Sequence, residues 1–324
     1  MNVALDNLAL WLCVALAATM GYAIQRGATC TVAAVDELVS QRSGKRLKGM
    51  LEASLWVLGC LLLAQATGLL LRMPPGFGLT TSAVFGGLLL GLGAYINRAC
   101  VFGAVARLGS GQWAYLLTPL GYFVGCALFQ WLLGHSPAQR LAEPSWALRL
   151  PTAVAWAALG LMLWRTTRPA WNGHSLAVWR RQVRAAWLEK VWSPHAATLV
   201  IGLTFVLMFL LAGPWAYTDV LGEWAMRRFD NSAARALLLA ALFGGALWGG
   251  WTAGRWKHTP ATPRDLGRCL LGGALMGWGS MWIPGGNDGL ILMGMPLLWP
   301  YAWVAFAAMC GAIALAMVLA RRHK

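Results

Sequence analysis

Nine apolar stretches follow one another along this 324-residue chain, and all but the fifth, which is short, are as long as a membrane-spanning helix. A helix needs about 20 apolar residues to cross the hydrocarbon core of a bilayer, within a range of about 17 to 25. Such segments over the whole chain predict an all-α, polytopic membrane protein. The nine predicted spans are Leu8–Ile24, Leu51–Leu71, Leu79–Ile96, Trp113–Leu133, Leu150–Trp164, Ala196–Ala212, Ala233–Trp251, Leu266–Ile283 and Leu297–Ala320.

Composition and charge agree with this class. Charged residues make up 11% of the chain, less than half of the roughly 25% found in soluble domains. A net charge of +15 would indicate nucleic-acid binding in a soluble protein. In a membrane protein the same Arg and Lys residues are expected in the loops, where they set the orientation. No nucleic-acid partner is therefore predicted, and the first residues, MNVALDN, lack the basic region of a cleavable signal.

The basic residues are divided unevenly between alternate loops. Cytoplasmic loops of membrane proteins carry the excess of Arg and Lys. This rule predicts an outer N-terminus, an odd number of spans and a cytoplasmic C-terminus. The first inner loop alone carries Arg42, Lys45, Arg46 and Lys48, whereas the outer loops together carry only Arg72, Arg140, Arg149, Arg227, Arg228 and Arg235.

Four semi-apolar segments between the predicted spans are too short to cross the membrane. Irregular backbone at membrane depth is tolerated only where it is buried in protein or lines a wet cavity. We therefore expect re-entrant segments, with interfacial amphipathic helices as the alternative. The four segments are Gly27–Val39, Ala99–Leu108, Pro214–Met226 and Gly285–Met295.

Both ends of the chain repeat one order of elements: span, re-entrant segment, two spans, re-entrant segment, span. Because five predicted spans precede the second set, the second half is predicted to be inverted relative to the first, as in many transporters. The predicted units are a first transmembrane half, 1–149, a central span with a cytoplasmic linker, 150–195, and a second transmembrane half, 196–324.

The linker contains the sequence SLAVWRRQVRAAWLEKVW, which has helical spacing of its apolar residues. Trp179, Val183, Trp187 and Val191 fall on one face. The pattern predicts an amphipathic helix that lies on the cytoplasmic membrane surface against lipid. A docking site for a partner protein is the alternative.

A similar polar pattern stands at the start of two of the predicted re-entrant segments, where the preceding span ends. An arginine at membrane depth usually marks a functional pathway, although near the end of a span it also reaches the interface by extending its side chain. The small residues that follow admit a ligand, and N–H groups at the start of a short helix add positive potential. Together these features predict an anion site. The two patterns are Gln25-Arg26 before Cys30 and Asn97-Arg98 before Cys100.

The cysteines in these two patterns narrow the class of anion. A thiol is soft, polarizable and a weak hydrogen-bond donor, so it suits a sulfur-bearing anion better than chloride or phosphate. No two cysteines form C-x-x-C, and no His/Cys cluster has metal-ligand spacing; neither a metal nor a cofactor is predicted. The other five cysteines lie in long apolar runs: Cys13, Cys60, Cys126, Cys269 and Cys310.

A third motif, IPGGNDGLILMGMP, runs from Ile283 to Pro296. Its proline and glycines interrupt the helix. We predict that Asp288 caps a short helix beginning near Leu290, as Asn287 would equally do. The alternatives are that Asp288 pairs with Arg98 or exchanges a proton.

The segments QRGATC, NRACVFGAVARLGSG and GGNDGL together resemble the YeeE/YedE family, the membrane proteins of thiosulfate uptake and related sulfur transport. The resemblance extends over nearly the whole chain and includes the nine-span count. It implies that Cys30 and Cys100 lie on the substrate path, since family members pass thiosulfate between cysteines in three central motifs. The third motif departs from this pattern, because Gly286 stands where a cysteine is expected. Either the N–H groups of Gly285 and Gly286 take that place, or the substrate differs.

The predicted function is an inner-membrane transporter or channel for a small sulfur-containing anion, with thiosulfate first and a related sulfur or selenium compound as the alternative. A membrane thiol oxidoreductase or sulfurtransferase would need paired cysteines and a quinone or dithiol partner. A non-transporting anchor subunit would not need Arg and Cys in its central motifs. The resemblance also implies a bacterial inner-membrane location and a small cytoplasmic sulfur-carrier protein as partner. No ATP-binding P-loop is visible, so direct coupling to ATP is not expected.

Overall fold

The computed structural model describes residues 7–70, 76–134, 136–143, 145–171, 189–283 and 285–322. Within these residues the protein is all-helical, with two isolated β-bridges and no strand, as the apolar stretches predicted. Most of the predicted amphipathic linker helix falls on residues 172–188, outside the described part of the chain.

Long and short helices alternate in the order expected from the sequence. The long helices of the described chain are α1 (Asn7–Gly27), α3 (Lys45–Ala66), α4 (Thr81–Asn97), α6 (Leu117–Leu133), α7 (Thr152–Trp171), α9 (Pro194–Ala212), α11 (Ser232–Thr252), α12 (Pro263–Trp282) and α14 (Pro300–Arg322). The short ones are α2 (Thr31–Gln41), α5 (Val101–Gly109), α10 (Tyr217–Ala225) and α13 (Asn287–Gly289), which continues as the π-helical turn η3 (Leu290–Gly294). Two 3₁₀ turns, η1 (Trp113–Leu116) and η2 (Trp146–Arg149), precede α6 and α7.

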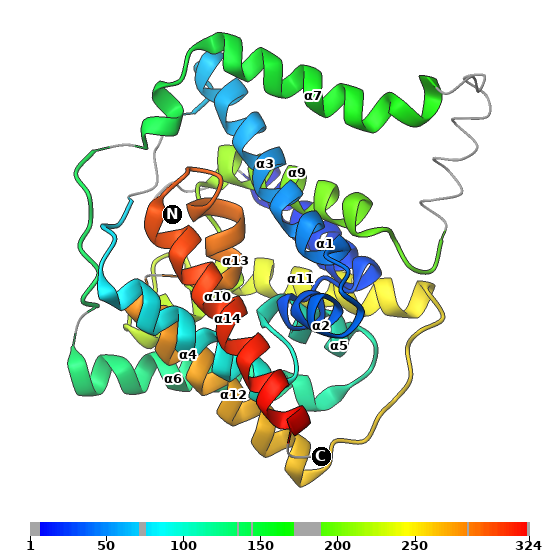
Figure 1. Ribbon diagram of the computed structural model, residues 1–324, viewed down its shortest axis with the longest axis vertical. Helices are drawn as coiled ribbons and strands as arrows, with labels where there is room; N and C mark the ends of the chain where they lie inside the picture. Colours follow the sequence, from blue (N-terminus) through cyan, green and yellow to red (C-terminus); the bar gives the residue numbers. More distant parts are fainter. Residues whose placement is uncertain are drawn as a thin grey trace.

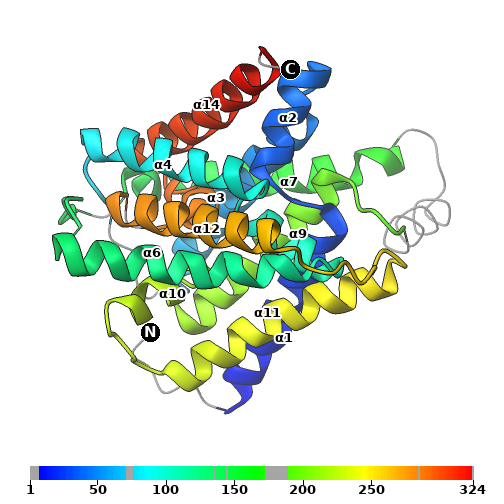
Figure 2. The same cartoon turned by 90° about the horizontal axis from the view of Figure 1, so that it is seen from below.

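Eight of the long helices pack as two rows of four. One row runs α14, α4, α12, α6, from top to bottom in Figure 2, and the other runs α11, α1, α9, α3. Helix α7 packs on α3 at the end of the second row and crosses the top of Figure 1. The short helices fill the space between the rows: α2 packs on α3 and α14, α5 on α1 and α11, α10 on α6, and η3 on α3 and α14.

The packing is almost unchanged when the two halves exchange places. Under this exchange α1 corresponds to α9, α2 to α10, α3 to α11, α4 to α12, α5 to α13 and α6 to α14. The pair α6–α12 then becomes α14–α4, α1–α11 becomes α9–α3, and α6–α10 becomes α14–α2; all of these pairs are in contact. Such a pattern is what two repeats around a two-fold axis produce, and it supports the predicted inverted halves.

Glycines let the helices of the first row approach closely. Helix α12 lies between α4 and α6 and turns glycines toward both neighbours, so that backbone meets backbone. Small residues at such contacts are typical of helix packing in membranes. The facing residues are Gly272 with Gly93, Gly279 with Gly86, Gly273 with Thr118 and Gly277 with Tyr122.

Seven segments of the described chain are long and apolar enough to cross a membrane: α1 with α2, α3, α4 with α5, η1 with α6, α9, α11 and α14. The apolar part of α7 is shorter, Thr152–Arg165, and the glycines and first-turn charges of α12 lower its hydropathy. Since α12 is held between α4 and α6, little of it has to face lipid. The protein is thus a multi-pass membrane protein, and the count of nine spans stays a prediction.

Contacts among helix ends and connecting segments fall into two groups, one for each side of the membrane. Each contact joins segments that the charge pattern predicts on the same side of the membrane. On the predicted inner side these are Arg321 with Asp36, Arg165 with Glu52 and Trp113 with His258. On the predicted outer side they are Phe77 with Arg140 and Ser145 with Leu297.

Replacing Gly277 by alanine is expected to destabilise the protein. The added Cβ would overlap the carbonyl oxygen of Tyr122 on α6, and overpacking of this kind costs about 1–3 kcal/mol. Gly267→Ala, on the same helix with nothing within 4 Å of the added Cβ, should gain about 0.5–1 kcal/mol instead. Thermal unfolding of the purified variants in detergent measures both changes; equal melting temperatures would refute the close α6–α12 contact.

The orientation is tested by labelling introduced cysteines with a membrane-impermeant maleimide. We expect Lys45→Cys to react only after cell disruption and Gln139→Cys to react in intact cells or spheroplasts. Both positions are exposed, whereas all seven native cysteines are buried or half-buried, so the unmodified chain serves as the background. Reaction of Lys45→Cys from the outside would reverse the predicted orientation.

Candidate functional site

The four short helices begin in the same way between the two rows. Each is preceded by one residue in extended backbone conformation, whose carbonyl accepts the first helical N–H four residues on. These N-cap residues and their hydrogen-bond lengths are Cys30 (2.9 Å), Cys100 (2.8 Å), Ala216 (3.2 Å) and Gly286 (3.0 Å). The two cysteines singled out in the sequence therefore occupy equivalent N-cap positions, and Gly286 is the counterpart of Cys100 in the second half.

The helices that precede the two cysteines end in the same hydrogen-bond pattern. Thr29 N–H donates to the Ile24 carbonyl and Ala99 N–H to the Ala94 carbonyl, five residues back, a helix end that needs a left-handed residue just before. That residue is Ala28 (φ 46°) in the first motif and Arg98 (φ 59°) in the second. Arg98 thus corresponds to Ala28, and the predicted match between Arg26 and Arg98 is wrong by two positions.

The side chains of Cys30 and Cys100 lie next to each other at the starts of α2 and α5. Cys30 is 7% exposed and Cys100 is fully buried. The N–H of Thr31, at the start of α2, donates to Cys100 Sγ over 3.2 Å. Gly103 makes room for this contact, since a Cβ there would overlap Cys30 Sγ. The site therefore joins the first turns of α2 and α5 through their sulfur atoms.

The two arginines lie apart from the thiols. Arg26 is 4% exposed, and its guanidinium donates to the Tyr22 hydroxyl (2.6 Å), the Thr252 hydroxyl (3.0 Å) and the Glu189 carbonyl (3.0 Å). It also lies over the Tyr22 ring, 5.0 Å from the centroid. Arg98 is exposed at the end of α4. Arg26 therefore ties the end of α1 to α11 and to the segment before α9, while Arg98 faces outward.

The two amides beside the arginines are buried in the turns. Asn97 Nδ2 donates to the Ala99 carbonyl (2.7 Å), and its Oδ1 accepts from the Thr118 hydroxyl (3.0 Å). Gln25 Nε2 donates to the Ser110 hydroxyl over 3.4 Å. Asn97 thus holds the chain reversal that precedes α5, whereas Gln25 joins the end of α1 to the residue that follows α5.

The third motif reaches the thiol site from the second half. Gly285 has a φ of +135°, a conformation that favours glycine, and Gly286 follows in extended conformation. Asn287 is fully buried, and its Nδ2 donates to the Thr31 hydroxyl over 3.2 Å. The structure thus brings the third motif into contact with the first residue of α2, next to the two cysteines.

Asp288 does not cap the helix as predicted. The N-cap is Gly286, without a side-chain cap, and Asp288 lies within the first turn. Its Oδ1 accepts from the Thr218 hydroxyl (2.5 Å) and from the Gly289 N–H (3.0 Å), while its Oδ2 has no hydrogen-bond partner. The hydrogen bond from the Thr218 hydroxyl comes from α10, and no sequence pattern near Asp288 predicts it.

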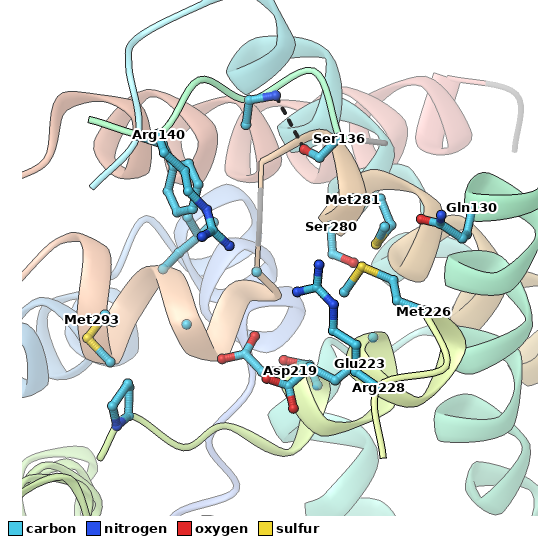
Figure 3. A pocket seen from close by; sticks show the side chains of 18 of the residues that line it. Gln130, Ser136, Arg140, Asp219, Glu223, Met226, Arg228, Ser280, Met281 and Met293 are labelled. Atoms are coloured by element: carbon cyan, nitrogen blue, oxygen red, sulfur yellow. Dashed lines mark hydrogen bonds between the residues drawn. The ribbon is translucent and has the colours of Figure 1, made fainter. Parts of the chain in front are cut away.

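A cavity of about 600 Å³ opens on the predicted outer side and ends at the second-half motifs (Figure 3). Thr218, Asp219, Gly285 and Gly289 line it, but neither Cys30 nor Cys100 does. Figure 3 shows the guanidinium groups of Arg140 and Arg228 reaching into it and the carboxylates of Asp219 and Glu223 close together. Its wall also contains three thioethers: Met226, Met281 and Met293.

Hydrogen bonds between the halves separate this cavity from the thiols. The Tyr217 hydroxyl donates to the Val101 carbonyl over 2.9 Å, and Asn287 binds Thr31. These groups are buried, so the protein is closed between cavity and cysteines.

Thr31, Thr218 and Asp219 were missed in the sequence. Asp219 carried the same signal as Asp288, an acidic residue in a predicted re-entrant segment. Thr31 follows the N-cap residue Cys30, and Thr218 follows Tyr217, the first residue of α10. Only the fold shows that helices begin at these positions. Within the described residues, no group of three or more His, Cys, Asp or Glu side chains could hold a metal ion.

Comparison with known proteins supplies a family. No curated protein matches this chain. The sequence model of the family described as sulphur transport matches residues 26–315, a range that contains all four short helices and seven of the nine long ones in full, with most of α14 and the last two residues of α1. This match confirms the resemblance carried by the motifs around Cys30, Cys100 and Gly286. The chain belongs to the sulphur transport family of membrane proteins.

Proposed function

We propose that this protein carries a small sulfur-containing anion, thiosulfate above all, across the bacterial inner membrane. The observation that carries the proposal is the position of the Cys30 and Cys100 side chains next to each other at the starts of two short helices between the rows. The path runs from the cavity past Gly285, Gly286, Asn287 and Asp288 to the two thiols, and from there to the inner side.

The path favours an anion for two reasons. Helices α2, α5 and α10 turn their N-terminal ends toward it, and such ends carry free N–H groups and positive potential. At the cavity, the exposed Arg140 and Arg228 draw anions from outside. Asn97 contributes indirectly, because it holds the turn before Cys100, and Gln25 and Arg26 fasten the end of α1, which leads into Cys30, to neighbouring elements.

The path favours sulfur because its contact groups are soft. Met226, Met281 and Met293 line the cavity, and the two thiols lie behind it. Thiosulfate has a polarizable terminal sulfur, which accepts hydrogen bonds from the S–H groups of thiols. In place of a third cysteine, the backbone N–H of Gly286 offers a hydrogen bond to its oxygens. The N–H of Gly285, expected to serve in the same way, already donates to the Ser280 carbonyl over 3.1 Å.

A thiol oxidoreductase is the second candidate, because Cys30 and Cys100 lie next to each other. Disulfide exchange requires an attacking thiolate to reach a sulfur atom, and these sulfur atoms are buried. A small anion fits such a site better than a partner protein does. A cytoplasmic sulfur-carrier protein would instead receive the anion at the inner face, where Arg98 and the basic loops are exposed.

Cys100→Ala is expected to lower uptake of ³⁵S-thiosulfate into proteoliposomes by about tenfold. The loss of one hydrogen bond to a charged ligand is worth about 1.5 kcal/mol, which corresponds to a factor of about ten. Cys126→Ala is the matched control, because Cys126 is equally buried but donates to the Gly277 carbonyl between α6 and α12. Equal effects of the two substitutions would show that the motif cysteine is structural, and an inactive wild type would refute transport.

Gly286→Cys is expected to reduce uptake rather than complete a three-thiol path. The new Cβ would lie 2.5 Å from Asp288 Oδ1 and 2.6 Å from Thr218 Oγ1, so it would displace their hydrogen bond. Gly244→Cys, on α11 with nothing within 4 Å, should transport like the wild type. Faster uptake by Gly286→Cys would contradict the proposal that backbone N–H groups serve at the third motif.

A further inference from the structure

The chemistry of the central site is divided between the two halves. The N-cap cysteines Cys30 and Cys100 belong to the first half, whereas their counterparts Ala216 and Gly286 carry no thiol. The second half instead carries Asp219 in the first turn of α10 and Asp288 in the first turn of α13. The first-half residues at the two corresponding places are apolar: Ala33 and Phe102.

Asp288 is a buried carboxylate with an unsatisfied oxygen. It is 1% exposed, and its Oδ2 has no partner, nor has Oδ1 of the adjacent Asn287. An ionised carboxylate at this depth needs a cation or several donors to stabilise its charge. Within the described residues, Asp288 forms no ion pair; its donors are the Thr218 hydroxyl and one N–H group.

The surrounding elements supply little positive charge. From α11, Arg235 acts on Asp219 but is paired with Glu223 of α10. Arg140 and Arg228 are exposed at the cavity. The other titratable groups that face the pair are neutral: Tyr122 and Cys126 from α6, Tyr217 from α10 and Tyr301 from α14.

Asp219 connects Asp288 to water. Asp219 is half-buried and lines the cavity, and its Oδ1 lies 4.0 Å from where a Cβ on Gly289, the residue after Asp288, would stand. Thr218, between them in the fold, contacts Asp288 and also lines the cavity. Two neighbouring carboxylates in a region of low dielectric bind protons as a pair.

We propose that Asp219 and Asp288 form a proton-binding site that couples anion uptake to protons, an inference that rests on the transport function proposed above. One proton moves from cavity water to a carboxylate oxygen of the pair and is released on the inner side with the anion. Protonation removes the repulsion between the ionised pair and a dianion that enters the path. It also reduces the net charge moved from two negative charges to one, so the membrane potential opposes uptake less.

The proposal is tested in proteoliposomes with equal ³⁵S-thiosulfate on both sides and the membrane potential held at zero by potassium and valinomycin. An acidic exterior should drive accumulation, by about tenfold per pH unit for one proton per anion. Asp288→Asn and Asp219→Asn should each lose this accumulation while they retain thiosulfate counterflow. Asp36→Asn is the matched control, because Asp36 is an exposed carboxylate in the middle of α2, paired with Arg321, and this variant should accumulate thiosulfate normally.

The outcomes separate this inference from transport itself. Normal counterflow by the wild type without accumulation under a pH gradient would overturn the proton site and leave transport standing. Accumulation by both Asp variants at the wild-type level would do the same. If wild-type liposomes showed no counterflow, the proposed function would fail and this inference with it. Should Asp288→Asn elute as an aggregate in size-exclusion chromatography, Asp219→Asn and the wild-type response still decide the matter.

Discussion

Every backbone N–H and C=O group at membrane depth must find a partner within the protein, because the hydrocarbon offers none. This constraint is severe here, since the chain reverses four times between the two rows of long helices. All four reversals satisfy this constraint in the same way: the carbonyl of an extended N-cap residue accepts the first N–H hydrogen bond of the short helix. The rows in turn shield these reversals from lipid, and their outer faces carry the exposed leucines, for example Leu88 on α4, Leu128 on α6, Leu207 on α9 and Leu315 on α14.

The same constraint explains why the site lies where it does. A helix that starts between two rows cannot satisfy its first N–H groups within its own turn, so it leaves donors at the centre. Thr31 N–H has found a sulfur, Cys100 Sγ. The scaffold is thus nearly symmetric in backbone, while its chemistry is asymmetric: thiols approach from one half and carboxylates from the other.

The helices were predicted well from the sequence, because an apolar run and the polar or glycine-rich residues that interrupt it are local signals. The predicted segment Ala99–Leu108 overlaps α5 almost completely, and Pro214–Met226 contains α10. The pairing of Cys30 with Cys100 depends on the packing of α2 against α5, which no local pattern encodes. The arginine match failed for a related reason: Arg26 and Arg98 share neighbours in the sequence, but the left-handed helix end falls two residues later in the first motif.

The acidic residues illustrate the limit of motif reasoning. Asp288 stood in a glycine-rich break, where capping is the usual role of an aspartate. Its actual donor, Thr218, comes from α10, 70 residues earlier in the chain. Asp219 had no thiol or arginine pattern beside it, and its place at the cavity became visible only when α10 was seen to pack on α6.

The barrier between cavity and thiols consists of the same kinds of groups that would bind the substrate. Asn287 Nδ2 now donates to Thr31, the Tyr217 hydroxyl to the Val101 carbonyl, and Thr31 N–H to Cys100 Sγ. Each of these donors is able to turn to an anion that arrives between the halves, and exchange of one hydrogen bond for another changes the free energy little. On the proposed path the barrier would open without exposing unsatisfied groups to lipid, because the anion would replace the contacts that it breaks. A ligand that accepts no hydrogen bonds would make no such replacement, so the closed state would keep it out.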